Sequence, residues 1–133
     1  MNFKIYLIGD KIPKHFKSAI EEYEKRLSRY CKIQLVEVKN QEMLIKVLTN
    51  TSYKIYLSVK GESVSSTELS TKFNEYATSG KSEIAIIYGL DPPQFDEHLS
   101  ISQMDIEDGL LITILFEQIY RAYRILHNHA YHK

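Results

Sequence analysis

The chain has 133 residues, of which 44% are hydrophobic and 26% are charged, with five Gly and three Pro. This composition excludes disordered and fibrous proteins, and the length predicts a single domain over residues 1–133. Seventeen basic and seventeen acidic residues cancel, so the overall charge does not by itself indicate nucleic-acid binding. Neither a signal-peptide pattern nor an apolar run near the roughly 20 residues of a membrane span is visible. With Cys31 as the single cysteine, we expect a cytoplasmic protein without a disulfide or a membrane contact.

The first half of the chain predicts a strand, helix, strand order. Short runs rich in Ile, Leu and Val that are followed by turn residues such as Gly or Asn are typical of buried parallel strands. Apolar residues spaced by three and four, from Phe16 to Tyr30, predict one apolar face of a helix. Asn40 can cap a second helix. The predicted elements are a strand over 3–8, a helix over 16–30, a strand over 33–38, a short helix over 43–48 and a strand over 55–59.

The second half continues the alternation. Ser65 and Glu68 form a capping-box pattern, which predicts a helix that stops near Gly80. A strand over 84–88 and a short segment over 99–102 follow. We expect Asp108 to cap a long helix over 109–126, with Glu107 and Asp108 matched to the helix dipole. Together these elements predict an α/β fold with one mainly parallel sheet and helices on both of its faces.

Charge is distributed unevenly toward the end of the chain. Eight acidic residues and no Lys or Arg lie between Lys81 and Arg121, whereas no acid follows Glu117. We therefore expect the C-terminal segment to contact nucleic acid if the protein binds it.

Two C-terminal motifs carry a specific resemblance. Residues 117–125 read Glu-Gln-Ile-Tyr-Arg-Ala-Tyr-Arg-Ile, and residues 128–133 read Asn-His-Ala-Tyr-His-Lys. They resemble the end of the RlmH-type methyltransferases of the SPOUT superfamily, and the Leu57-x-x-x-Gly61 strand end agrees. The resemblance covers nearly the whole chain, although the segment around 38–48 is shorter than is usual for that family.

The resemblance implies a fold, a reaction and partners. The fold would contain a C-terminal trefoil knot, and the protein would be a homodimer. The reaction would transfer the methyl group of S-adenosylmethionine to N3 of a pseudouridine in large-subunit rRNA, with no metal. The substrate would be ribosomal RNA or the ribosome itself.

The resemblance also implies site residues. The S-adenosylmethionine site would be formed by Leu57, Gly89, Ile101, Ser102, Gln103, Met104, Asp105 and Ile106. Catalysis would use Tyr131, His132 and Arg121. Substrate RNA would be held by Arg121, Arg124, His129 and Lys133.

Several of these residues have alternative interpretations. The loop Gly89-Leu90-Asp91-Pro92-Pro93 lacks the adjacent glycines of the family, and each proline removes an N–H donor. A non-catalytic SPOUT relative that acts as a dimeric RNA- or protein-binding module is therefore the alternative function. The C-terminal residues could instead form a solvated tail, and Arg121 and Arg124 could be internal ion-pair partners. His127-x-His129-x-x-His132 lacks the cysteines of structural zinc sites, so we expect no metal.

Overall fold

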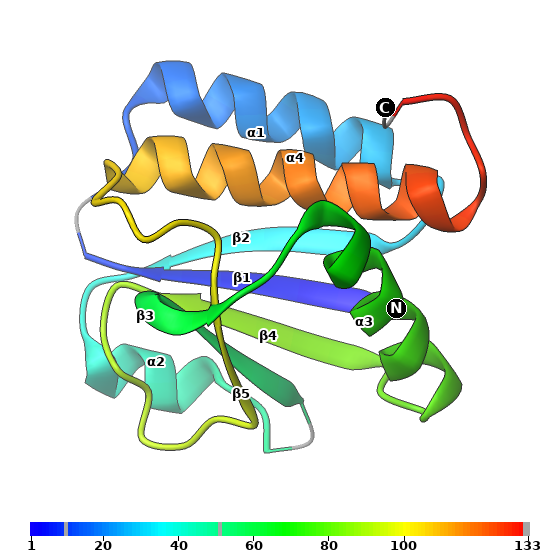
Figure 1. Ribbon diagram of the computed structural model, residues 1–133. Helices are drawn as coiled ribbons and strands as arrows, with labels where there is room; N and C mark the ends of the chain where they lie inside the picture. The colour runs from blue at the N-terminus through cyan, green and yellow to red at the C-terminus, as the bar shows by residue number, and fades with distance from the viewer. Residues whose placement is uncertain (10, 51, 132–133) are drawn as a thin grey trace.

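A parallel sheet of five strands runs through the middle of the molecule in the computed structural model, which describes residues 1–9, 11–50 and 52–131 (Figure 1). The strand order is β2-β1-β4-β3-β5, and every pairing is parallel. The prediction of a mainly parallel sheet is confirmed. The strands are β1 (Asn2–Ile8), β2 (Lys32–Val38), β3 (Tyr53–Ser63), β4 (Glu83–Tyr88) and β5 (Glu97–Ser100).

Helices cover both faces of the sheet, as predicted, but unequally. Three helices share one face, with α4 between α1 and α3, and α2 lies on the other face (Figure 1). Ile112, Phe116 and Ile119 of α4 are fully buried, so this helix is the centre of the larger core. Among the described residues, no helix is both long and apolar enough to cross a membrane. The helices are α1 (Lys14–Leu27), α2 (Gln41–Val47), α3 (Ser66–Thr78) and α4 (Asp108–Leu126).

Side-chain caps form at two of the three positions where the sequence predicted them. The Asn40 side chain accepts from the N–H of Met43 at 3.0 Å. Ser65 and Glu68 form the reciprocal capping box, with hydrogen bonds of 2.9 and 3.1 Å. The prediction for Asp108 was wrong: it is the first residue of α4, and its predecessor occupies the cap position without a side-chain cap. Asp108 still lies in the first turn, where its charge favours the helix dipole.

A close approach between two backbones joins β3 to β5. Leu57 pairs with Leu99, the chain then bulges, and Glu62 pairs with Leu99 again. At Gly61 an added Cβ would lie 2.4 Å from the carbonyl carbon of Leu99, so only glycine fits there. Gly61 is thus required by the path of the backbone. The knot implied by the resemblance stays a prediction.

Glu97 ties the start of β5 to α3 and β3. Its carboxylate accepts hydrogen bonds from the Tyr53 hydroxyl at 2.7 Å, the Tyr76 hydroxyl at 2.5 Å and the Lys72 ammonium at 2.9 Å. Burial would raise the pKa of Glu97, but these donors outweigh it and hold the pKa below its usual value. Burial and the hydrogen bond with Glu97 raise the pKa of Tyr53 and of Tyr76. The ionised form of Glu97 therefore stabilises this end of the sheet.

Replacing Glu97 with Gln should lower the free energy of unfolding by about 1–3 kcal/mol at pH 7, because three donors lose a charged acceptor. A carboxylate with a lowered pKa stabilises the fold above the unfolded-state pKa of about 4.3, and this stabilisation is lost as the pH falls through the folded-state pKa. In urea unfolding, the gap between wild type and variant should close below about pH 4. The exposed Glu21→Gln variant is the control and should show no gap. A gap that does not narrow as the pH falls below about 4.3 would contradict the electrostatic account.

Candidate functional site

Three of the segments predicted to bind a cofactor meet at the carboxyl end of the sheet. Leu57 of β3 is in register with Tyr88 of β4 and with Leu99 of β5. Gly89 follows β4 directly, and Ile101 follows β5. The crevice at the carboxyl ends of parallel strands is where α/β proteins bind ligands. The structure therefore brings the predicted cofactor segments to one edge.

A cavity of about 400 Å³ opens beside this edge, between the sheet and the helices α3 and α4. Two residues of the predicted cofactor set, Leu57 and Ile101, line it. Most of the remaining wall is apolar, which suits the flat face of an aromatic ligand. The other lining residues are Ile55, Val64, Ser65, Ser66, Leu69, Phe73, Ile86, Leu99, Ile114, Leu115 and Gln118.

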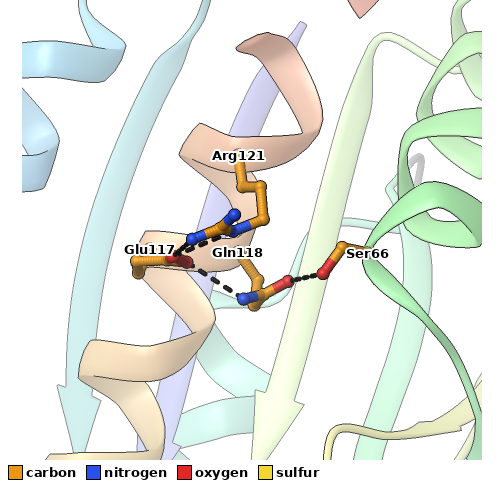
Figure 2. Close-up of polar contacts among 4 residues, drawn as sticks. All are labelled: Ser66, Glu117, Gln118 and Arg121. Carbon is orange, nitrogen blue, oxygen red and sulfur yellow. Dashed lines mark hydrogen bonds and ion pairs between the residues drawn. The ribbon is translucent and has the colours of Figure 1, made fainter. Parts of the chain in front are cut away.

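One wall of the cavity carries a polar chain of contacts across α3 and α4 (Figure 2). The Ser66 hydroxyl donates to Gln118 Oε1 at 2.5 Å, and Gln118 Nε2 donates to Glu117 Oε2 at 3.0 Å. Glu117 Oε1 accepts from Arg121 Nε and Nη2 at 3.0 and 2.7 Å. Sequence reasoning named Arg121 but missed Ser66 and Gln118, because 52 positions separate them. The Glu-Gln pair in the C-terminal motif was the available signal.

The loop over 101–106 is held by short-range hydrogen bonds of serine hydroxyls with the loop backbone. The Ser100 hydroxyl donates to the Ser102 carbonyl at 2.8 Å, and the Met104 N–H donates to the Ser102 hydroxyl at 3.0 Å. Met104 is 74% exposed, and Gln103 and Asp105 are exposed as well. Of this loop only Ile101 reaches the cavity wall, while Ile106 packs against the core.

Gly89 has a structural requirement of its own. Its φ is +118°, and an added Cβ would lie 2.2 Å from the carbonyl oxygen of Ile8. The contact that excludes a side chain is therefore with β1, and Gly89 does not line the cavity. Next to it, burial and the nearby carboxylates of Asp108 and Asp105 raise the pKa of Tyr88. The end of β4 thus faces negative charge.

The C-terminal tail is docked on its own chain through Arg124. One guanidinium nitrogen donates to the Tyr30 hydroxyl and contacts His129 Nδ1, both at 3.1 Å, and the other donates to the Ala130 carbonyl at 3.1 Å. The Tyr30 hydroxyl lies 2.6 Å from His129 Nδ1. Arg124 and His129, both predicted to hold RNA, therefore have partners within the protein, and those of Arg124 are a hydroxyl, a histidine and a carbonyl. The ion-pair interpretation fits Arg121, which pairs with Glu117.

Arg121 and Tyr131 also contact each other. The guanidinium carbon of Arg121 lies 4.7 Å from the Tyr131 ring centroid, within cation–π range. Burial and the charge of Glu117 raise the pKa of Tyr131. His132 and Lys133 lie outside the described residues. Within the described part of the chain, no three His, Cys, Asp or Glu side chains are grouped as metal ligands would be.

Within one chain, the end of the predicted cofactor loop lies away from the C-terminal tail along α4. Tyr131 lies beside Arg121, and Arg121 is about 20 Å along α4 from Asp108 at ~1.5 Å per residue. The loop over 101–106 precedes Asp108. The end of this loop and the tail are thus near different ends of α4, whereas Leu57 and Ile101 line the same cavity as Gln118, which precedes Arg121 by three residues.

Comparison of the sequence with known proteins places this chain among methyltransferases. The family model described as "Predicted SPOUT methyltransferase" matches residues 1–132. Ribosomal RNA large subunit methyltransferase H 1 of Thermoanaerobacter sp. (strain X514) is 46% identical over 133 residues, all of both chains. The ribosomal RNA large subunit methyltransferases H of Shouchella clausii (strain KSM-K16) and Clostridioides difficile (strain 630) are 35% and 33% identical over 159 aligned positions, again across all of each chain. These two alignments contain more positions than this chain has residues, whereas the Thermoanaerobacter relative has the same short length.

Acidification should release the tail. A guanidinium only donates, so His129 Nδ1 must be unprotonated in the docked tail. Burial and the charges of Arg124 and Arg29 lower the pKa of His129. Docking is therefore favoured above the unfolded-state pKa of about 6.5 and is lost as the pH falls through the folded-state value. Amide hydrogen exchange over 128–131, corrected for intrinsic rates, should be faster at pH 5.5 than at pH 7.5.

The matched control is His129→Asn, whose side-chain carbonyl can accept the same hydrogen bonds without titrating. The amide hydrogens over 128–131 of this variant should exchange at similar corrected rates at both pH values. Equal acceleration in wild type and His129→Asn would assign the pH dependence to another group.

Proposed function

The chain belongs to the SPOUT methyltransferase family, and from this premise we propose that it transfers a methyl group from S-adenosylmethionine to large-subunit ribosomal RNA. The names of its relatives support the substrate class. The C-terminal motif supports the finer assignment, which is N3 of a pseudouridine. The comparisons do not favour the non-catalytic alternative.

The observation that carries the proposal is the convergence of Leu57, Gly89 and Ile101 at one sheet edge, next to the apolar cavity. When bound, S-adenosylmethionine would supply a methyl group on a positively charged sulfonium. Leu57 and Ile101 are suited to hold an adenine ring away from water. Ser66 and Gln118 offer polar atoms at the same wall. The residues present therefore fit this cofactor.

Charge near the edge also suits a cationic cofactor. Asp105 and Asp108 face the end of β4 closely enough to raise the pKa of Tyr88. Carboxylates attract a sulfonium, and the attraction is stronger where water is excluded. This effect compensates in part for the N–H donors that Pro92 and Pro93 remove from the neighbouring loop.

The tail residues have different chemical capacities. N3 of the target base must lose its proton before it can bond to the methyl carbon. Tyr131, whose pKa is raised, stays a neutral phenol that can donate a hydrogen bond or stack on a base. His132 can accept the proton at neutral pH. Arg121 positions Tyr131 by covering its ring.

A homodimer would complete the site. Within one chain, about 20 Å of helix separates Asp108, at the end of the cofactor loop, from Arg121, which contacts Tyr131. A two-fold dimer places the same patch of each copy against the other, so a second copy can bring its tail to the first copy's cofactor edge. We therefore propose two composite sites per dimer.

Calorimetric titration tests the cofactor site. S-adenosylmethionine should bind with a micromolar dissociation constant, a free energy of about 8 kcal/mol. Ile114→Phe, which enlarges a side chain in the cavity wall, should weaken binding at least about tenfold by overpacking. Leu110→Phe on the same helix is the control, since Leu110 is 43% exposed, and it should bind normally. No heat with either the cofactor or its demethylated product would favour the non-catalytic alternative.

Subunit complementation tests the composite site. A chain ending at Ala130 and the Ile114→Phe chain should each be inactive in methylation of ribosomal subunits. The cofactor is kept near the wild-type dissociation constant, so that the Ile114→Phe site stays largely empty. Mixing the two chains should then restore roughly a quarter of wild-type activity, because half of the dimers would be mixed and each would hold one intact site. Absence of any recovery, with mixed dimers demonstrated by mass spectrometry, would place the whole site within one chain.

A further inference from the structure

A second hollow lies on the opposite face of the same strand end. Side chains alternate along β3, so Leu57 points into the cavity and Ser58 points to the face that carries α2. The hollow has a volume of about 290 Å³. We call it the outer hollow, and its lining residues are Tyr56, Ser58, Val59, Lys60, Asp91 and His98.

The outer hollow has an aromatic wall. The rings of Tyr56 and His98 stack with centroids 4.5 Å apart and an interplanar angle of 11°. Phe95 packs against both, at 5.4 and 5.6 Å, and is 46% exposed. The Tyr56 hydroxyl donates to Asp91, so its ring is held in place. Rigid, partly exposed aromatic faces are what proteins use to stack unpaired RNA bases.

The polar groups of the outer hollow are fixed as well. Ser58 Oγ and His98 Nε2 lie 2.6 Å apart and share a hydrogen bond, and the Lys60 N–H donates to the same hydroxyl at 3.2 Å. The Asp91 carbonyl accepts from Gln41 Nε2 at 3.1 Å. Where His98 Nε2–H donates to Ser58 Oγ, the Ser58 hydroxyl still offers its own O–H as a donor. The Lys60 ammonium is a second donor, and the Asp91 carboxylate is an acceptor. A uracil edge presents the complementary pattern, a ring N–H between two carbonyls.

We propose that the outer hollow binds the uracil-like ring of an unpaired uridine or pseudouridine of the substrate RNA. The ring stacks on the Tyr56 and His98 pair, and its edge meets Ser58, Lys60 and Asp91. This inference rests on the proposed function for the identity of the RNA. It adds a base-recognition site on the α2 face, separate from the C-terminal tail.

Nuclear magnetic resonance of the full-length protein tests the inference without requiring catalysis. Six-nucleotide oligouridylate is titrated while the ring signals of His98 are followed, with the exposed His15 on α1 as internal control. The His98 signals should shift saturably and those of His15 should not. Oligoadenylate should bind at least about threefold more weakly, because its edge does not match the donors and acceptor. Ser58→Ala should remove the preference for uridylate while leaving the melting temperature nearly unchanged.

The possible outcomes separate the two proposals. Unmoved His98 signals, equal shifts at His98 and His15, or a preference for oligoadenylate would overturn the outer hollow as a uracil site. Methylation of ribosomal subunits by a protein whose His98 signals do not move would leave the proposed function intact. Uridylate binding at His98 by a protein that neither binds the cofactor nor methylates RNA would overturn only the proposed function.

Discussion

The parallel pairing of β3 with both β4 and β5 is the constraint on which the candidate site depends. Leu57 is in register with Tyr88, the last residue of β4, and with Leu99 near the end of β5. The two strands therefore end at the same level of the sheet, and the loops that follow them lie close together. Farther along β3, the backbone at Gly61 again lies against the backbone of Leu99 in β5. The cavity and the outer hollow are the two faces of this junction, since alternation along the strand sends Leu57 to one and Ser58 to the other.

Helix α4 joins this junction to the C-terminal tail while filling the larger core. Its fully buried residues hold it between α1 and α3, which fixes its rotation about its own axis. That rotation presents Gln118 to the cavity and Arg121 to the tail, with Glu117 bonded to both. A single carboxylate therefore couples the polar wall of the cavity to the residue that positions Tyr131.

Local patterns predicted the elements well because their causes are local. The Ser65 capping box, the Asn40 cap and the apolar face of α1 each depend on residues within one or two turns. The cap of α4 was misplaced at Asp108 because Asp is a favoured cap residue, whereas the helix begins one residue earlier than that pattern suggests and has no side-chain cap. The contacts of Ser66 with Gln118 and of Arg124 with Tyr30 span 52 and 94 positions, and no local pattern specifies them. The resemblance named cofactor segments that lie together at one edge of the sheet, but it could not show that Gly89 is required by Ile8 or that the tail docks on its own chain.

The shortness of the chain has a physical consequence for recognition. Relatives that align over 159 positions have residues that this chain lacks, and the sequence predicts the difference around 38–48. That segment contains the last residue of β2 and all of α2, which pack on the smaller core. The cavity is built from β3, β4, β5, α3 and α4, so shortening there leaves its walls unchanged. The segment does border the outer hollow, because Gln41 holds the Asp91 carbonyl. A difference in length at α2 therefore falls beside the outer hollow, where we propose that RNA binds, and away from the residues that line the cavity.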